Sequence, residues 1–214
     1  MRLSKIYFVL IAITIFVTSP SILYAQSLLN SREFPSNSFK PVPQWSGVLD
    51  RMKGHKPFLD QCQKQLDSCV PGYFQTWNGA VNLPRTKNFK RILNFVNRKI
   101  NSKVYRLDDE NYGVSEYWAD VKEFLGKSGD CEDYSIAKYY ALKSIGIPID
   151  AMRIVAVKDR LKGGGHAILV VEHEGLRYVL DNLSAIVLTE DRLPHYIPQF
   201  SVNEEKRWTH FPLK

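Results

Sequence analysis

The chain has 214 residues and a net charge of +7, from 29 Lys and Arg against 22 Asp and Glu. Its basic residues are scattered, and their one modest cluster is better explained by a solvated helix face than by nucleic-acid binding. The cluster comprises Lys87, Lys90, Arg91, Arg98 and Lys99. We therefore expect no nucleic-acid partner.

The first 25 residues are typical of a secretory signal peptide. Arg2 and Lys5 form a basic start, residues 6–17 form an apolar run, and Ala25 ends a plausible cleavage site. The alternative is an uncleaved anchor, but this run falls short of the ~20 residues that cross a bilayer. We expect a periplasmic protein with no membrane span after cleavage. Cleavage removes two basic residues and no acidic one, which lowers the net charge from +7 to +5.

Two further segments follow the signal peptide. Residues 26–43 are rich in Ser, Asn and Pro, which predicts an extended or loose arm. Residues 44–214 are enough for a single domain with a substantial core.

The hydrophobic pattern predicts helices first and strands afterwards. Residues 44–127 are mainly helical in pattern, and the clearest helix covers 86–100. A second helix begins at Asp130 and ends before Gly146. The pattern then becomes strand-like over 152–157, 167–171, 176–180 and 185–188. This order indicates an α+β domain whose helical N-terminal part packs on an antiparallel sheet.

Three cysteines are present, an odd number for an exported protein. Cys62 and Cys69 can pair only if the helix ends before Cys69, because seven residues of continuous helix span ~10 Å. Whether they pair stays open. Cys131 is left alone, which raises the possibility of a reactive thiol.

Cys131 is the first residue of the helix that Asp130 caps, and Asp133 completes a capping-box pattern. Unsatisfied N–H groups and the helix dipole favour a thiolate at this position and could stabilise an oxyanion. The alternative is a small buried apolar residue. We interpret Cys131 as a nucleophile.

His166 and Asp181 complete a possible triad. His166 opens an apolar strand after three glycines, and a turn centred between His173 and Glu174 would make His166 and Asp181 direct cross-strand partners. A carboxylate there would fix the imidazole tautomer. A one-residue bulge would spoil this register, and a surface pair or a simple turn is the alternative.

The carboxylates beside Cys131 oppose ionisation of the thiol. A bound hard cation would cancel their charge, and calcium prefers such oxygen ligands. We therefore consider Asp130, Glu132 and Asp133 as possible calcium ligands. The alternative is that these residues only cap the helix. Sulfur is too soft for this role, and no zinc motif is present.

These residues resemble the bacterial transglutaminase-like cysteine proteinases, the LapG-type periplasmic proteases. The resemblance runs from about Ile92 to Trp208. Its most specific parts are Gly129-Asp130-Cys131-Glu132-Asp133-Tyr134 and Leu180-Asp181-Asn182-Leu183, and His166 lies between them.

The resemblance implies a papain-like, transglutaminase-type core with a Cys131–His166–Asp181 triad and a proteolytic activity. It implies calcium held by the acidic residues Asp130 and Glu132, whereas Asp133 matches a position that more often supports the structure. It further implies a large surface adhesin as substrate, cut in its N-terminal region so that biofilm disperses. An inner-membrane cyclic di-GMP receptor would be the inhibitory partner.

Two other hypotheses stay open at this point. One is a transglutaminase-like acyl or amide transferase that uses the same three residues. The other is a non-catalytic calcium-binding adaptor that retains the fold.

Overall fold

The structure is a computed structural model that describes residues 27–64, 73–83 and 86–213. The predicted signal peptide and Cys69 lie outside these residues. Cys62 is disulfide-bonded, and Cys131 is the free cysteine of the described part of the chain. Among the same residues, no helix combines the length and the apolar character needed to cross a membrane.

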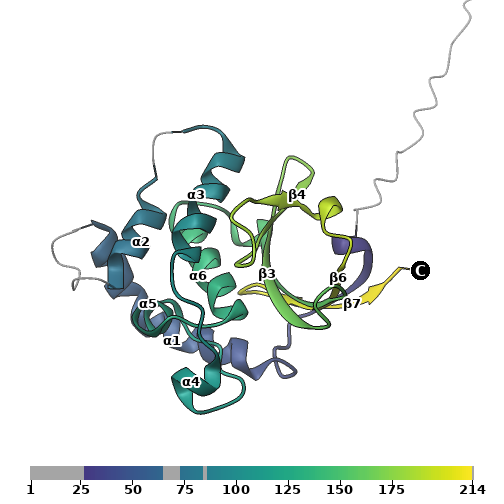
Figure 1. Ribbon diagram of the computed structural model, residues 1–214, viewed down its shortest axis with the longest axis horizontal. Coiled ribbons are helices and arrows are strands. Elements are labelled where there is room, and N and C mark those ends of the chain that lie inside the picture. The colour runs from purple at the N-terminus through teal and green to yellow at the C-terminus, as the bar shows by residue number, and fades with distance from the viewer. Residues whose placement is uncertain (1–26, 65–72, 84–85, 214) are drawn as a thin grey trace, which may run out of the picture.

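Helices gather on one side of the molecule and a strongly curled sheet on the other (Figure 1). The sheet is antiparallel throughout its described strands, in the order β1-β7-β6-β2-β3-β4-β5. The strands are β1 Ser31–Ser36, β2 Met152–Asp159, β3 Gly164–His173, β4 Leu176–Leu180, β5 Leu188–Thr189, β6 Tyr196–Val202 and β7 Arg207–Pro212. The helices are α1 Pro43–Lys64, α2 Tyr73–Val81, α3 Phe89–Asn101, α4 Asp108–Tyr112, α5 Val121–Lys127 and α6 Cys131–Ser144. The predicted α+β class is confirmed.

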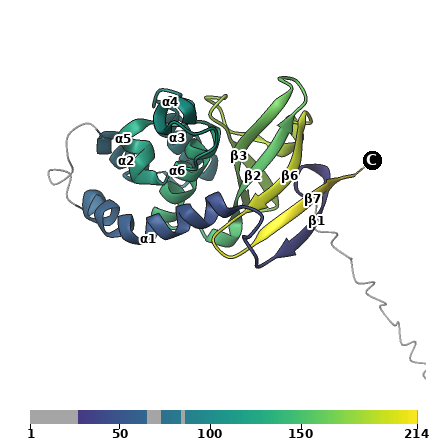
Figure 2. The ribbon, with the colours of Figure 1, turned by 90° about the horizontal axis from the view of Figure 1, so that it is seen from below.

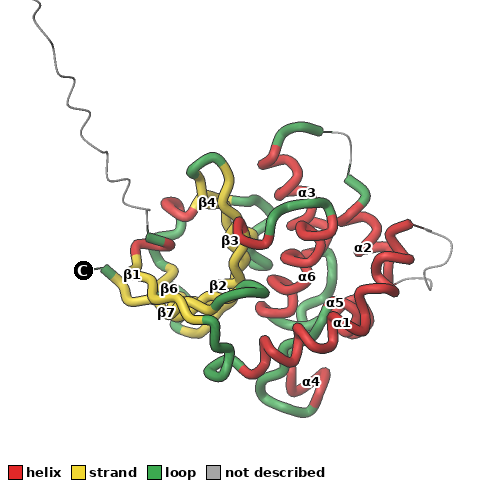
Figure 3. Tube along the Cα trace, turned by 180° about the vertical axis from the view of Figure 1, so that it is seen from behind, coloured by secondary structure: helices red, strands yellow, loops and turns green. Residues whose placement is uncertain are grey.

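Helix α6 lies between the other helices and strand β3 (Figures 1 and 3). Its residues are buried almost without interruption from Glu132 to Leu142. The main core lies between this helical layer and one face of the sheet, where Ile136 and Leu142 of α6 join Leu169 of β3. A helix surrounded in this way holds its first turn, and therefore Cys131, in a fixed position against the sheet.

The other face of the sheet is also buried. Val155 of β2 and Ile168 of β3 pack there in a second core with Leu28 and Leu29, which precede β1. The Leu29 N–H donates to Oε2 of Glu190 at 2.8 Å, which ties the β1 end of the sheet to the β5 end. Because both faces are covered, β2 and β3 read as nearly continuous apolar runs.

The described part of the segment predicted to be an extended or loose arm (26–43), residues 27–43, contributes a strand to the sheet. Its residues Ser31–Ser36 form strand β1, which pairs along its length with β7 (Figure 2). Buried His210 of β7 joins the strands further, since it hydrogen-bonds Ser31 of β1 and Ser201 of β6, each at 2.8 Å.

Most of the predicted elements are confirmed, with two corrections. Helix α3 overlaps most of the predicted 86–100 region but begins three residues later and ends one residue later, at Asn101. It starts after Asn88, whose side chain accepts from the Arg91 N–H. The strand predicted at 185–188 is wrong, because the short β5 begins only at Leu188. Strands β6 and β7 follow the last predicted strand and were not anticipated.

Candidate active site

Cys131 is the first residue of α6, as predicted, and is partly exposed. Its thiol lies 3.0 Å from Oε2 of Glu132, to which it donates. The main-chain N–H of Ala167 also hydrogen-bonds the sulfur, so the sulfur lies beside the residue that follows His166. The fold thus brings the start of α6 against the start of β3.

The charge around Cys131 opposes a thiolate. Burial raises the pKa of the thiol far above its ordinary value, and the neighbouring carboxylates of Glu132 and Asp130 raise it further. The Ala167 N–H only partly offsets them. The helix start was expected to favour the thiolate, but among the protein groups around the sulfur the carboxylates outweigh that effect.

His166 and Asp181 form a buried hydrogen-bonded pair. Nε2 of His166 lies 2.9 Å from Oδ1 of Asp181, and their side chains are only 8% and 6% exposed. Because the carboxylate engages Nε2, Nδ1 is the ring nitrogen left for proton exchange. A carboxylate in this position orients the imidazole and stabilises its protonated form.

The predicted register of the β3–β4 hairpin is wrong, although the pair forms. Leu169 pairs with Leu180, so the continued register would place Asp181 opposite Ile168 and not opposite His166. The turn is Glu174-Gly175, whose φ angles of 50° and 74° are those of a type I′ turn. The slip is two residues, which keeps His166 on the same face, within diagonal reach of Asp181.

Asp181 is held by further hydrogen bonds. Its Oδ1 also accepts from the Leu183 N–H at 2.9 Å, and its Oδ2 accepts from the Tyr196 hydroxyl at 2.6 Å. Burial raises the pKa of Asp181, but His166, Tyr196 and the Leu183 N–H outweigh it, so the net pKa lies below its usual value. Asp181 is therefore an anion whenever the protein is folded near neutral pH.

Helix α3 fixes the loop that carries Asp181. The amide of Asn101 donates to the main-chain carbonyls of Asp181 and Ser184, at 2.9 and 3.0 Å. The amide of buried Asn97 donates to the same Ser184 carbonyl at 2.7 Å. These two asparagines lie one turn apart on α3, so a rigid helix holds the loop.

Four carboxylates gather at the start of α6. Ligand atoms of Asp130, Cys131 and Glu132 lie within 4.8 Å of one another, and so do those of Asp108, Asp130 and Asp133. Burial and the charge of Glu132 raise the pKa of Asp130 to about 10, and burial raises that of Asp108. So many buried carboxyl groups cannot all ionise unless a cation compensates them.

The donor set fits a hard divalent cation. Oδ1 of Asp108 and Oδ1 of Asp130 are buried and have no hydrogen-bond partner among the described residues. Asp133 differs, because its Oδ1 accepts from the Ala119 N–H at 2.7 Å and its Oδ2 from the Asp130 N–H at 3.2 Å. The sequence suggested Asp133 as a possible ligand, but both of its carboxylate oxygens accept hydrogen bonds from the main chain. Free carboxylate oxygens are the ligands that calcium prefers.

Three residues near the site were not given a role from the sequence. Asp108 precedes the cluster by 22 positions, and Tyr196 follows Asp181 by 15. Lys138 of α6 is fully buried, and its Nζ has no hydrogen-bond partner among the described residues. Burial lowers the pKa of Lys138 to about 7, against the opposing charge of Asp181. No local pattern marks these residues, because only the fold brings them near the triad.

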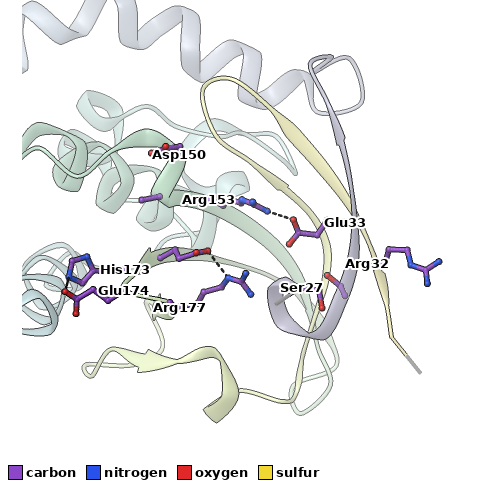
Figure 4. A pocket seen from close by; sticks show the side chains of 12 residues that line it. Ser27, Arg32, Glu33, Asp150, Arg153, His173, Glu174 and Arg177 are labelled. Atoms are coloured by element: carbon purple, nitrogen blue, oxygen red, sulfur yellow. Dashed lines mark hydrogen bonds and ion pairs between the residues drawn. The ribbon is translucent and has the colours of Figure 1, made fainter. Parts of the chain in front are cut away.

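The cavity drawn in Figure 4 lies elsewhere. It measures about 830 Å³, and its lining includes none of the three candidate residues Cys131, His166 and Asp181. Two of its arginines are paired with acidic residues of the lining, Arg153 with Glu33 at 2.6 Å and Arg177 with Glu172 at 3.1 Å.

A cysteine at a helix start, beside a strand that carries a histidine paired to an aspartate, is the arrangement typical of thiol hydrolases and acyl transferases of papain-like type. A family model described as bacterial transglutaminase-like cysteine proteinase (BTLCP) matches residues 51–213. The chain belongs to this family of cysteine proteases. No sequence among curated proteins matches it.

Solved structures agree with the family assignment. The chain is similar to Legionella pneumophila LapG, with 27% identity and a TM-score of 0.60 over 71% of this chain and 87% of LapG. The calcium-bound form of the same protein gives 28% identity and a TM-score of 0.61 over the same shares. An EGTA-treated form gives 27% identity and a TM-score of 0.60, covering 71% of this chain and 84% of that one.

Proposed function

We propose that this protein is a periplasmic, calcium-dependent cysteine endopeptidase that uses Cys131, His166 and Asp181. It cleaves the N-terminal region of a large surface adhesin and so promotes biofilm dispersal. One observation carries the proposal. His166 bonds Asp181, and the next residue on the strand, Ala167, donates its N–H to the Cys131 sulfur. Membership of a cysteine protease family supports the reaction type.

The proposed reaction has two steps. In the first, Nδ1 of His166 takes the thiol proton, and the sulfur of Cys131 attacks the scissile carbonyl. The carbon–nitrogen bond then breaks, and His166 returns the proton to the leaving amine, which leaves a thioester on Cys131. In the second step, His166 takes a proton from water, and the oxygen of that water attacks the thioester carbonyl. The carbon–sulfur bond then breaks, the acyl product leaves as a carboxylic acid, and His166 returns the proton to the sulfur. Asp181 stabilises the protonated imidazole during both steps.

Main-chain N–H groups at the start of α6 are the donors available for the oxyanion. Cys131 and Glu132 occupy the first two helical positions, where N–H groups have no partner within the helix. Their partial positive charge stabilises the negative oxygen of the tetrahedral intermediate.

In our proposal, Asp130 and Glu132 hold calcium, and the free oxygen of Asp108 adds a third carboxylate. When bound, calcium supplies positive charge that offsets these carboxylates and removes their opposition to the thiolate. The bond from the Cys131 thiol to Glu132 would then give way, because a carboxylate that serves the cation is a weaker acceptor for the thiol. The calcium-bound form of Legionella LapG supports this assignment.

The substrate, the compartment and the regulator follow from the resemblance to LapG-type proteases and form part of the same proposal. The adhesin would be cut outside the inner membrane, and an inner-membrane cyclic di-GMP receptor would sequester the protease. Co-purification of the protein with membrane fractions at high but not at low cyclic di-GMP tests this partner. Equal recovery in both conditions would reject it.

The main test compares the surface and medium proteins of cells that produce the wild type, Cys131→Ala or Ser144→Ala. Ser144 is an exposed residue at the far end of α6, so its variant controls for expression. We expect a large polypeptide in the medium of wild-type and Ser144→Ala cells and its absence with Cys131→Ala. Shedding by Cys131→Ala cells would reject the protease mechanism.

Calcium dependence is tested on the purified protein and the shed polypeptide as substrate. We expect cleavage to stop in EGTA and to return with added calcium but not with magnesium. Full cleavage in metal-free buffer would reject the calcium assignment while leaving the thiol mechanism in place.

A further inference from the structure

Tyr196 lies at the start of β6, with its ring fixed in the second core. It is 5% exposed and packs in the same cluster as Val155, Val157 and Val170. Its main chain is fixed as well, because it lies opposite Asp159 of β2 and its N–H donates to the Leu193 carbonyl at 3.2 Å. The hydroxyl is therefore presented from a rigid part of the fold.

The hydroxyl of Tyr196 donates to Oδ2 of Asp181 at 2.6 Å, and this hydrogen bond is buried. It joins the start of β6 to the loop that follows β4. The ring also lies beside the imidazole of His166, with 5.6 Å between the ring centroids. Burial and the bond to Asp181 raise the pKa of Tyr196, so the phenol stays protonated and remains a donor. Bonds of this type, from a hydroxyl to a charged carboxylate, are among the stronger ones in proteins.

The two oxygens of Asp181 are thus anchored separately. Oδ1 serves His166 and the Leu183 N–H, and Oδ2 serves Tyr196. With only one anchored oxygen, a carboxylate can turn about its Cβ–Cγ bond. With both anchored, its plane is fixed, and so is the direction from which it meets Nε2 of His166.

We propose that Tyr196 is a positioning residue for the reaction at Cys131 and that it acts through Asp181. It holds the carboxylate in the orientation that engages Nε2 of His166 and so keeps Nδ1 available to the thiol. The inference rests on the proposed function, because it requires that His166 exchange a proton with Cys131. Tyr196 itself touches neither the thiol nor the scissile bond in this scheme.

The test is a double-mutant cycle with Tyr196→Phe and Asp181→Asn in the full chain with calcium present. The readout is the alkylation rate of Cys131 by iodoacetamide, followed by mass spectrometry of the Cys131 peptide, which needs no protein substrate. We expect Tyr196→Phe to slow alkylation by about tenfold, as expected for a lost bond to a charged group. In the Asp181→Asn background, the same substitution should change the rate by less than about twofold.

Two control variants separate positioning from general damage. Tyr140→Phe removes another buried hydroxyl that bonds a carboxylate, that of Glu204, near the other end of α6, and should leave the rate unchanged. Val170→Ala loosens the core that holds the Tyr196 ring without removing the hydroxyl, and should lower the melting temperature but not the rate.

Three results would overturn the inference. The first is a wild-type alkylation rate in Tyr196→Phe. The second is an equal fractional loss in both backgrounds, and the third is a matching loss in Val170→Ala. Both of these would indicate an effect that does not pass through Asp181. Failure of the proposed function looks different: the wild type and His166→Ala would react at the same rate. That outcome would remove proton exchange between His166 and Cys131 and the inference with it.

Discussion

Nε2 of His166 and Oδ1 of Asp181 lie 2.9 Å apart, and their side chains are almost completely buried. This bond gives the two ring nitrogens of His166 different roles. Nε2 bonds the aspartate, and Nδ1 is left to exchange a proton with the thiol. The lowered pKa of Asp181 keeps the carboxylate charged, so it stabilises the imidazole when the proton arrives.

Asp181→Asn should slow the reaction of Cys131 and the cleavage of the substrate by about a thousandfold or more. The amide keeps the shape of the side chain but supplies no charge and can hold the wrong imidazole tautomer. Steady-state cleavage and alkylation by iodoacetamide measure the effect, with Asp191→Asn, an exposed substitution, as the matched control. Retained cleavage in Asp181→Asn would show that this aspartate does not support His166.

Calcium should raise the melting temperature of the wild type and leave Asp130→Asn unaffected. A ligand that binds only the folded state stabilises it by mass action, and Asp130 supplies a buried carboxylate oxygen without a partner among the described residues. The same substitution at exposed Asp109, one residue after Asp108, should keep the full shift. Thermal unfolding in calcium and in EGTA gives the comparison, and an equal shift in both variants would place the ion elsewhere.

Gly129→Ala should destabilise the fold by more than about 2 kcal/mol, whereas Gly126→Ala should be nearly neutral. A Cβ at Gly129 would lie 1.9 Å from Oδ2 of Asp133, so Asp133 would have to give up its bonds to the main chain. A Cβ at Gly126 meets nothing within 4 Å. Denaturant unfolding of both variants measures the difference, and equal stabilities would show that Asp133 can move without loss.

Stability should fall between pH 6.5 and pH 4 because of His210. Burial and the charge of Arg153 lower its folded pKa to about 4, against the charge of Glu33, whereas an unfolded histidine titrates near 6.5. The unfolded chain therefore binds more protons in this window, and acid favours unfolding. From pH 7.5 to pH 5, the loss from this site should be about 2 kcal/mol.

His210→Gln provides the comparison for this effect, since glutamine can hydrogen-bond Ser31 and Ser201 but does not titrate in this range. The difference in unfolding free energy between pH 7.5 and pH 5 should be smaller in the variant by that amount. An identical pH dependence would show that His210 does not couple protonation to folding.

The sequence by itself determined the local parts of this protein. The α+β class, the start of α6 at Cys131 and the existence of α3 follow from hydrophobic period and capping residues, which act within a few positions. The crowding of carboxylates at Cys131 could also be read directly, because Asp130, Glu132 and Asp133 are neighbours along the chain.

Only the tertiary structure decided what joins distant segments. The register of β3 and β4 depends on the two-residue turn at Glu174-Gly175. A turn centred one residue earlier fits the polar segment 172–175 equally well in sequence and would shift the pairing by two residues. The hydroxyl of Tyr196, the free oxygen of Asp108 and the amides of Asn97 and Asn101 reach the site from other strands and helices. Their positions depend on how the helical layer packs on the sheet. Such packing brings together residues that are far apart in the sequence, and no local sequence pattern predicts which of them will meet.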